Sequence, residues 1–247
     1  MENNSKSSLP IVIIGLVLVA ALGAFWWFSN RPKTPTTANS NSTGSTAKQA
    51  AGIPSNAPPG ASPAWTKGSP SALVTVEEFA DFQCPTCATM HPKVNEIRAA
   101  FGDRVRIVFR QFPLQMHQFG YDAASAAEAA GMQGKFWEMQ NLLFSNQKTW
   151  SVSIDAKKIF TEYAKTLGLD VQKFSDDMNG LAIKNRIDAD LKRGQAAAVS
   201  STPSFYINGK PLGNNLDGLR EAVEAELKRV EGAKNEVANS NANTGNK

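Results

Sequence analysis

From residue 65 onward, the hydrophobic positions switch between the period of a strand and the period of a helix. Residues 73–80 form an apolar run that predicts a strand buried on both faces. Residues 84–101 predict a helix, with Gly102 as its terminator. In residues 104–110, apolar side chains alternate with neighbours that are mostly arginine, which predicts a second strand. The first part of the folded region is therefore expected to be a strand–helix–strand unit.

A long helical block is predicted next, over residues 120–199. It opens with the alanine-rich stretch 123–130, which allows helices to approach closely. Apolar side chains then recur at helical spacing in residues 159–167 and again in residues 183–191. Because this block lies between strands of the predicted sheet, we interpret it as an insert.

The pattern returns to that of a strand in residues 204–207. Asn208 and Gly209 follow directly and are typical of a two-residue hairpin turn. Asp217 is expected to cap a final amphipathic helix. The whole order predicts an α/β fold in which a helical insert, about residues 116–200, interrupts a small sheet.

The N-terminal region carries a second hydrophobic signal. Residues 11–28 contain no charged side chain and end near Trp26 and Trp27. Eighteen helical residues span roughly 27 Å, which is close to the hydrocarbon thickness of a bilayer. We therefore predict a transmembrane anchor over residues 10–29, after a short tail, 1–9. A cleaved signal peptide is the competing interpretation, but the run is long for one and lacks a good cleavage site.

Charge alone does not fix the topology of this anchor. Lys6 precedes the apolar run, and Arg31 and Lys33 follow it. A short tail before a first span usually stays in the cytoplasm, and the close pair of cysteines, Cys84 and Cys87, suits an oxidising compartment. We therefore expect a single-pass protein of the cell membrane with its C-terminal domain on the extracytoplasmic side.

Two segments lack the apolar residues that a core needs. Residues 30–64 consist largely of Ser, Thr, Asn, Ala, Pro and Gly, which predicts a disordered linker. Residues 232–247 have a similar composition and predict a disordered tail. The folded domain is then expected to span residues 65–231.

The net charge of +4 could indicate an acidic partner. However, lysines and arginines are spread along all 247 residues, and no run of five or six like charges occurs. We therefore expect an ordinary solvated surface and no nucleic-acid partner.

The candidate chemistry lies at Cys84 and Cys87, the two cysteines of the chain. They form a Cys-Pro-Thr-Cys motif where the first predicted strand meets the following helix. Unpaired N–H groups at a helix start stabilise a thiolate, so Cys84 is the expected nucleophile. Cys87 lies one turn later and is the expected resolving thiol. Pro85 suits the first helical turn, where its missing N–H costs little.

Two alternatives involve no redox catalysis. The cysteines could form half of a metal site, with His91 one helical turn further on, as in a non-catalytic metallochaperone module. The chain lacks the second close-spaced pair that structural zinc sites normally have. A structural ligand-binding module is a further alternative, and it predicts no redox activity.

Several segments together resemble the DsbA-type disulfide oxidoreductases of the thioredoxin fold. The resemblance covers residues 68–231. Its motifs are Gly-Ser-Pro at 68–70, Val-Glu-Glu-Phe-Ala-Asp-Phe-Gln-Cys-Pro-Thr-Cys at 76–87, Phe-Arg-Gln-Phe-Pro-Leu at 109–114, Gln-Gly-Lys-Phe-Trp at 133–137 and Thr-Pro-Ser-Phe-Tyr-Ile-Asn-Gly at 202–209.

This resemblance implies roles for five residues. Cys84 and Cys87 match the redox pair. Pro203 matches a proline that is cis in this family, with Thr202 before it, although base rates alone favour a trans bond. A substrate segment could pair with the backbone exposed there. Glu78 matches an acidic residue under the active-site helix that could relay the proton of Cys87. From its position alone, Glu78 could equally be a partly exposed strand residue.

The chain departs from the best-known strong oxidant of this family at two points. Threonine precedes the second cysteine where that protein has histidine, so one stabilising charge for the thiolate is missing. Ser201 stands where relatives often have glycine. Neither change removes a group that exchange requires.

The sequence therefore predicts a membrane-anchored thiol–disulfide oxidoreductase that introduces disulfides into folding proteins. Its substrates would be proteins that contain cysteine, and a membrane or soluble redox partner would recycle the pair. No cofactor is expected. A reductase or isomerase is the alternative within the class, because composition does not set a reduction potential.

Overall fold

A five-stranded sheet organises the residues that the computed structural model describes, 52–244, with side chains described through residue 236. The strand order is β1-β3-β2-β4-β5. Strand β2 pairs in parallel with β3 and antiparallel with β4, while β1 and β5 pair antiparallel at the two edges. The strands are β1 (Trp65–Lys67), β2 (Val74–Ala80), β3 (Val105–Gln111), β4 (Ser204–Ile207) and β5 (Lys210–Pro211).

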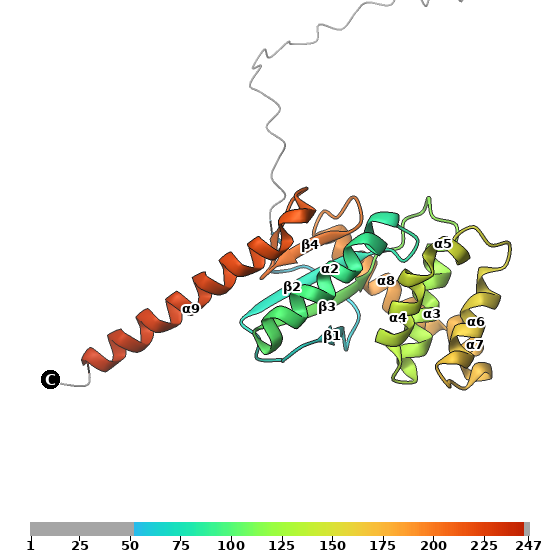
Figure 1. Ribbon diagram of the computed structural model, residues 1–247, viewed down its shortest axis with the longest axis horizontal. Helices are drawn as coiled ribbons and strands as arrows, with labels where there is room; N and C mark the ends of the chain where they lie inside the picture. The colour runs from blue at the N-terminus through green and yellow to red at the C-terminus, as the bar shows by residue number, and fades with distance from the viewer. Residues whose placement is uncertain (1–51, 245–247) are drawn as a thin grey trace, which may run out of the picture. The chain divides into compact units, whose positions relative to one another are not determined.

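Helices connect and cover this sheet. The helix α2 (Pro85–Phe101) carries the chain from β2 to β3, through the short 3₁₀ turn η1 (Gly102–Arg104), and lies against both strands in Figure 1. The 3₁₀ turn η2 (Leu216–Gly218) leads into α9 (Leu219–Thr244). The insert contains α3 (Gly120–Met132), α4 (Phe136–Ser145), α5 (Gln147–Trp150), α6 (Ala156–Thr166), α7 (Val171–Met178) and α8 (Leu181–Ala196).

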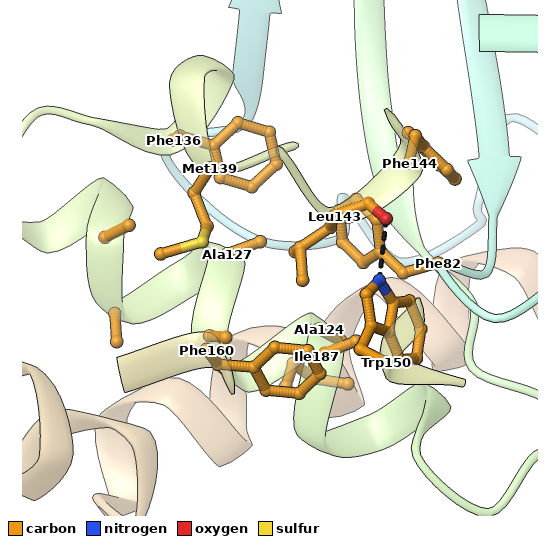
Figure 2. Packing of buried hydrophobic residues seen from close by; sticks show 14 of the residues in the cluster. Phe82, Ala124, Ala127, Phe136, Met139, Leu143, Phe144, Trp150, Phe160 and Ile187 are labelled. Carbon is orange, nitrogen blue, oxygen red and sulfur yellow. Dashed lines mark hydrogen bonds between the residues drawn. The ribbon is translucent and has the colours of Figure 1, made fainter. Parts of the chain in front are cut away.

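Three hydrophobic clusters hold these layers together, and the smallest consists of Phe79, Phe112, Ala197 and Tyr206. One fills the space between the sheet, α2 and the first half of α9, where alternate strand residues meet helical stripes. The largest joins the insert to Ala80, Phe82 and Phe109 of the sheet region, and the alanines of α3 let α4, α6 and α8 pack closely. In Figure 2, Trp150 is fully buried in the insert core, and its Nε1 donates to the carbonyl of Leu143 at 2.7 Å. The end of strand β2 and the insert therefore share one hydrophobic core.

Most predicted elements are confirmed. The thioredoxin-like α/β order is observed, and Gly102 ends α2 with a φ of 54°. The hairpin turn has positive φ at Asn208 and Gly209, as a type I′ turn requires. The short strand β1 was not predicted, because three residues are too few to show a period.

The start of the last helix was predicted incorrectly. Asn215, not Asp217, provides the capping side chain, and it caps the 3₁₀ turn η2. The carboxylate of Asp217 instead pairs with Lys93 at 2.7 Å. At its other end, α9 continues to Thr244, whereas the sequence predicts a disordered tail from residue 232.

The end of the predicted linker is also ordered against the domain. Residues 52–64, here called the strap, were expected to be disordered because they offer little apolar surface. The strap is fixed instead by polar contacts: the N–H of Ile53 donates to Gly209, and the N–H of Ala61 donates to Asp190 at 2.7 Å. Gly60 has a φ of 80° and lies so close to Arg110 and Asp190 that a larger residue would not fit.

The predicted membrane anchor, residues 10–29, lies outside the described residues. Among the helices of residues 52–244, none combines the length and hydropathy that a membrane crossing needs.

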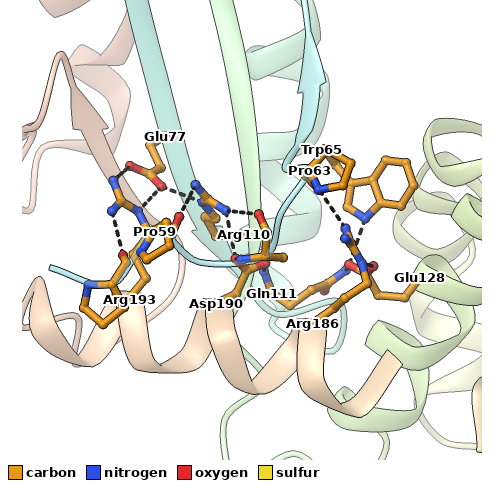
Figure 3. Close-up of polar contacts among 12 residues, drawn as sticks. Pro59, Pro63, Trp65, Glu77, Arg110, Gln111, Glu128, Arg186, Asp190 and Arg193 are labelled. Carbon is orange, nitrogen blue, oxygen red and sulfur yellow. Dashed lines mark hydrogen bonds and ion pairs between the residues drawn. The ribbon is translucent and has the colours of Figure 1, made fainter. Parts of the chain in front are cut away.

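A buried network of charges joins the strap to the sheet and to α8 (Figure 3). Arg110 on β3 contacts Glu77 at 2.6 Å and Asp190 at 3.0 Å, and Arg193 also binds Glu77. Burial opposes ionisation of Glu77, but Arg193 and Arg110 outweigh it and lower the pKa of this carboxyl. Burial raises the pKa of Asp190, which is fully buried. Both arginines also donate to strap carbonyls at Pro58, Pro59 and Ala61.

Replacing Arg110 by methionine is expected to destabilise the domain by about 3–5 kcal/mol, because it removes one partner of a buried ion pair and leaves Asp190 without a counter-ion. Urea unfolding measures the loss. The matched control is Arg104→Met, which removes an exposed pair with Glu231 and should cost about 1 kcal/mol or less. Equal losses in the two variants would contradict this role for Arg110.

Candidate active site: a dithiol at the start of α2

A tight turn after β2 places Cys84 at the N-cap of α2. Cys84 has the extended backbone of a cap residue, and its N–H donates to the carbonyl of Asp81 at 3.1 Å. Pro85 is the first residue of the helix. The Asp81 carboxylate accepts hydrogen bonds from the N–H of Gln83 and Leu114, each at 2.7 Å. Hydrogen bonds within the turn and to Leu114 therefore fix the position of Cys84.

The two sulfurs and the Thr202-Pro203 segment lie together. Cys84 is 7% exposed and Cys87 is fully buried, which matches the predicted difference in access. The peptide bond before Pro203 is cis. In its neutral form, the Cys84 thiol donates to the carbonyl of Thr202 at 3.2 Å. Cys84, Cys87 and the Thr202-Pro203 segment before β4 therefore form one site.

Hydrogen bonding favours the ionised form of Cys84. The largest contribution comes from the Cys87 thiol, which donates to the Cys84 sulfur. Burial opposes ionisation, while the Thr202 side chain and the N–H groups of Cys87 and Thr86 favour it. Together they lower the pKa of Cys84 to about 5. At neutral pH this cysteine is almost entirely a thiolate, the form that attacks a disulfide.

The second thiol is held in its neutral form. Burial, followed by the nearby Cys84 sulfur, raises the pKa of Cys87 far above its ordinary value. Glu78 on β2 is close enough to contribute to this shift. Glu78 is itself 3% exposed, and its Oε1 has no hydrogen-bond partner. Burial raises the pKa of Glu78 to about 8, so it carries a proton at neutral pH.

Replacing Thr202 by valine is expected to raise the pKa of Cys84, because the Thr202 hydroxyl is one of the groups that favour the thiolate. This hydroxyl is buried and has no hydrogen-bond partner when Cys84 is a neutral thiol. The ultraviolet absorbance of the thiolate, followed against pH, measures the shift. Thr89→Val is the matched control, because the Thr89 hydroxyl donates to Pro85 and not to a sulfur. An unchanged Cys84 titration in Thr202→Val would contradict the role of this hydroxyl.

The insert also holds the nucleophile, through a residue that the sequence analysis missed. Gln147 in α5 is buried, and its amide Nε2 donates to the carbonyl of Phe82 at 2.6 Å and to that of Cys84 at 2.9 Å. A single glutamine in a helical insert carries no sequence signal of this role.

The two histidines lie apart from the sulfurs. His117 contacts the Asp81 carboxylate at 2.7 Å, and the ring of His91 packs against that of Phe144 at an interplanar angle of 32°. Within the described residues, no three His, Cys, Asp or Glu side chains are grouped closely enough to hold a metal ion. His91 therefore does not complete the Cys-Cys-His cluster that the metal-binding alternative requires.

The fold and the dithiol are those of the thioredoxin-like class of proteins. A family model described as Thioredoxin matches residues 62–225, and the chain belongs to this family. A thioredoxin-like oxidoreductase from Silicibacter pomeroyi DSS-3 is 28% identical, with a TM-score of 0.58 over 67% of this chain and 92% of that one.

Two further solved structures share the fold. BdbD from Bacillus subtilis is 24% identical, with a TM-score of 0.60 over 67% of this chain and 93% of that one. The α-DsbA1 protein of Wolbachia pipientis is 19% identical, with a TM-score of 0.60 over 70% of this chain and 94% of that one. The predicted resemblance to DsbA-type proteins is thus confirmed at the level of the fold.

Curated relatives by sequence are much longer proteins. A Na(+)/H(+) antiporter NhaA 1 of Mycolicibacterium gilvum is 36% identical over 149 residues, which is 58% of this chain and 23% of that protein. The antiporter NhaA of Herminiimonas arsenicoxydans is 33% identical over 163 residues, 66% of this chain and 25% of that protein. The chain thus spans about a quarter of the length of these relatives.

Proposed function

We propose that the protein is a membrane-anchored, extracytoplasmic enzyme that donates the Cys84–Cys87 disulfide to proteins that contain cysteine. The observation that carries the proposal is the position of Cys84, beside the N–H groups at the start of α2, the Cys87 thiol and the Thr202 side chain, where its pKa is lowered to about 5. A cysteine in this environment leaves readily as a thiolate, which is what a disulfide donor requires.

The reaction balances without a cofactor. A substrate thiolate attacks the sulfur of Cys84 in the disulfide, a mixed disulfide forms, and Cys87 leaves as a thiolate. Glu78, protonated at neutral pH and near Cys87, is the proposed proton source for this thiolate. The second substrate thiolate then attacks the substrate sulfur of the mixed disulfide, and Cys84 leaves. Two electrons have passed to the protein, so a redox partner must remove them.

The direction of exchange follows from which form is stabilised. The lowered pKa of Cys84 favours the reduced protein: this contribution is fully present above pH 9.0, the ordinary value, decreases below it and is lost as the pH falls through about 5. A stabilised reduced form makes the disulfide form a better oxidant, by about 30 mV for each 1.4 kcal/mol. We therefore favour an oxidase over a reductase or an isomerase.

The extracytoplasmic location is proposed on two grounds. The apolar run 11–28 is long enough for an anchor, and a disulfide donor persists in an oxidising compartment.

Equilibration of the Cys84–Cys87 pair with glutathione buffers tests the direction. The proposal predicts a potential well above that of general cytosolic reductants, together with reoxidation of reduced, unfolded ribonuclease. A potential as low as that of such reductants would overturn the oxidase and support the reductase. Tight, stoichiometric binding of Cu(I) or Zn(II) without any exchange activity would support the metal-binding alternative.

A further inference from the structure

The carboxylate of Asp81 lies between the turn 81–84, which presents Cys84, and the loop 112–119, which follows β3. Its side chain has an exposed fraction of 0%. The N–H of Gln83, from the turn, donates to Oδ1, and the N–H of Leu114, from the loop, donates to Oδ2. The loop makes a further contact through His117, whose Nδ1 lies 2.7 Å from Oδ2. The carboxylate therefore joins the two segments, and His117 contributes a side chain to this junction.

The contact between His117 and Asp81 is a charge-assisted hydrogen bond. Nδ1 is the donor, because a carboxylate only accepts hydrogen bonds. The side chain of His117 is 19% exposed, so the bond is largely shielded from water. Such a bond is roughly twice as strong as one between neutral groups. His117 therefore holds the carboxylate more firmly than a neutral side chain would.

Two further contacts fix the loop against the turn. The N–H of Phe119 donates to Oε1 of Gln83 at 2.6 Å. At Gly120, the first residue of α3, a Cβ would lie only 2.9 Å from Oδ1 of Asp81. The start of α3 thus lies directly against the carboxylate, and the turn cannot shift without moving the loop.

The main chain of Asp81 contacts both cysteines. Its carbonyl accepts the N–H of Cys84 at 3.1 Å. Burial raises the pKa of Cys87, whereas the N–H of Asp81, which donates to the Cys87 sulfur, lowers it. In the proposed reaction, Cys87 leaves as a thiolate when a substrate attacks Cys84. A displacement of Asp81 would therefore affect the attacked sulfur and the leaving sulfur together.

We propose that His117 is a positioning residue for disulfide exchange: its Nδ1 holds the Asp81 carboxylate, and Asp81 in turn holds the turn that presents Cys84. This inference rests on the proposed function and adds to it a residue that acts on the dithiol without touching either sulfur. The hydrogen bond carries the effect, so any side chain that donates from the position of Nδ1 should replace the imidazole.

The test compares His117→Leu with His117→Asn. Leucine removes the donor, whereas the amide nitrogen of asparagine stands the same number of bonds from Cα as Nδ1 does. His117→Leu should slow the reduction of the disulfide by glutathione on the order of tenfold, because small misplacements of reacting groups are costly. It should also raise the pKa of Cys84 in the reduced protein, followed by thiolate absorbance. His117→Asn should restore both values.

The matched control is His91→Leu, which removes the other histidine of the chain. His91 packs against Phe144 and hydrogen-bonds with Asn141 and Asn95, so this variant should leave the Cys84 titration unchanged. His117→Ala takes the place of His117→Leu if the leucine variant does not unfold cooperatively.

Three results would overturn the inference. They are an unchanged rate and titration in His117→Leu, a loss of stability alone, and a failure of His117→Asn to restore what leucine removes. If the wild-type disulfide reacts with no thiol, the proposed function fails by itself. The titration of Cys84 in the three proteins then still decides whether His117 holds the turn.

Discussion

Cys84→Ser is expected to reduce disulfide exchange to the uncatalysed background. Serine keeps the size of the side chain, but its hydroxyl does not ionise in this pH range and forms no disulfide. Cys87→Ser should behave differently, because Cys84 remains a nucleophile while the fully buried residue that resolves the mixed disulfide is lost. This variant should therefore accumulate mixed disulfides with its substrates.

Insulin reduction and ribonuclease refolding measure the first effect, and non-reducing gels followed by mass spectrometry measure the second. Both variants should unfold at nearly the midpoint of the reduced wild type, since a hydroxyl replaces a thiol of similar size. Wild-type activity in Cys84→Ser, or mixed disulfides carried by Cys87 and not by Cys84, would contradict the assignment of the nucleophile.

Glu78→Gln is expected to change both stability and rate. Burial raises the pKa of Glu78 from 4.5 to about 8. The stability that this shift contributes is fully present below pH 4.5 and is lost as the pH rises through about 8. At about 1.4 kcal/mol per pKa unit, the loss amounts to several kcal/mol. Glutamine does not ionise, so the variant should gain stability relative to the wild type across this window.

The unfolding free energy of the disulfide form isolates this effect, because neither cysteine titrates there. Glu77→Gln is a neighbouring control in which stability should change with pH in the opposite direction. The pKa of Glu77 is lowered, so its contribution to the free energy of unfolding is present above the ordinary pKa of 4.5 and is lost as the pH falls. Loss of the proton source in Glu78→Gln should also slow release of Cys87 on the order of a hundredfold. A pH profile of stability identical to that of the wild type would contradict the buried, protonated carboxyl.

The sequence was sufficient for features that depend on local patterns. Two patterns predicted the strands β2 and β3: the apolar run before Cys84, and the alternation of apolar residues with arginines in residues 104–110. Each strand has seven residues, which is long enough for its pattern to be visible in the sequence. The Asn208-Gly209 turn was predictable, since its backbone requires residues that adopt positive φ. The candidate site could also be predicted, because its two cysteines lie within four consecutive residues at the start of a helix.

Long-range polar contacts were not predictable. Gln147 reaches Cys84 across 63 positions, and Asp190 meets the strap across 129. Nothing in the neighbours of either residue indicates such a partner. The strap was missed because composition predicts order only through apolar burial, whereas Arg110 and Arg193 hold this segment through its backbone carbonyls.

The central claim is that the start of α2, Cys87 and Thr202 keep the sulfur of Cys84 ionised. The most direct test is the pH dependence of Cys84 ionisation in the reduced protein, followed by thiolate absorbance and by the rate of alkylation. The account predicts half ionisation near pH 5. Half ionisation at about pH 8.5, the value of a free cysteine, would contradict it.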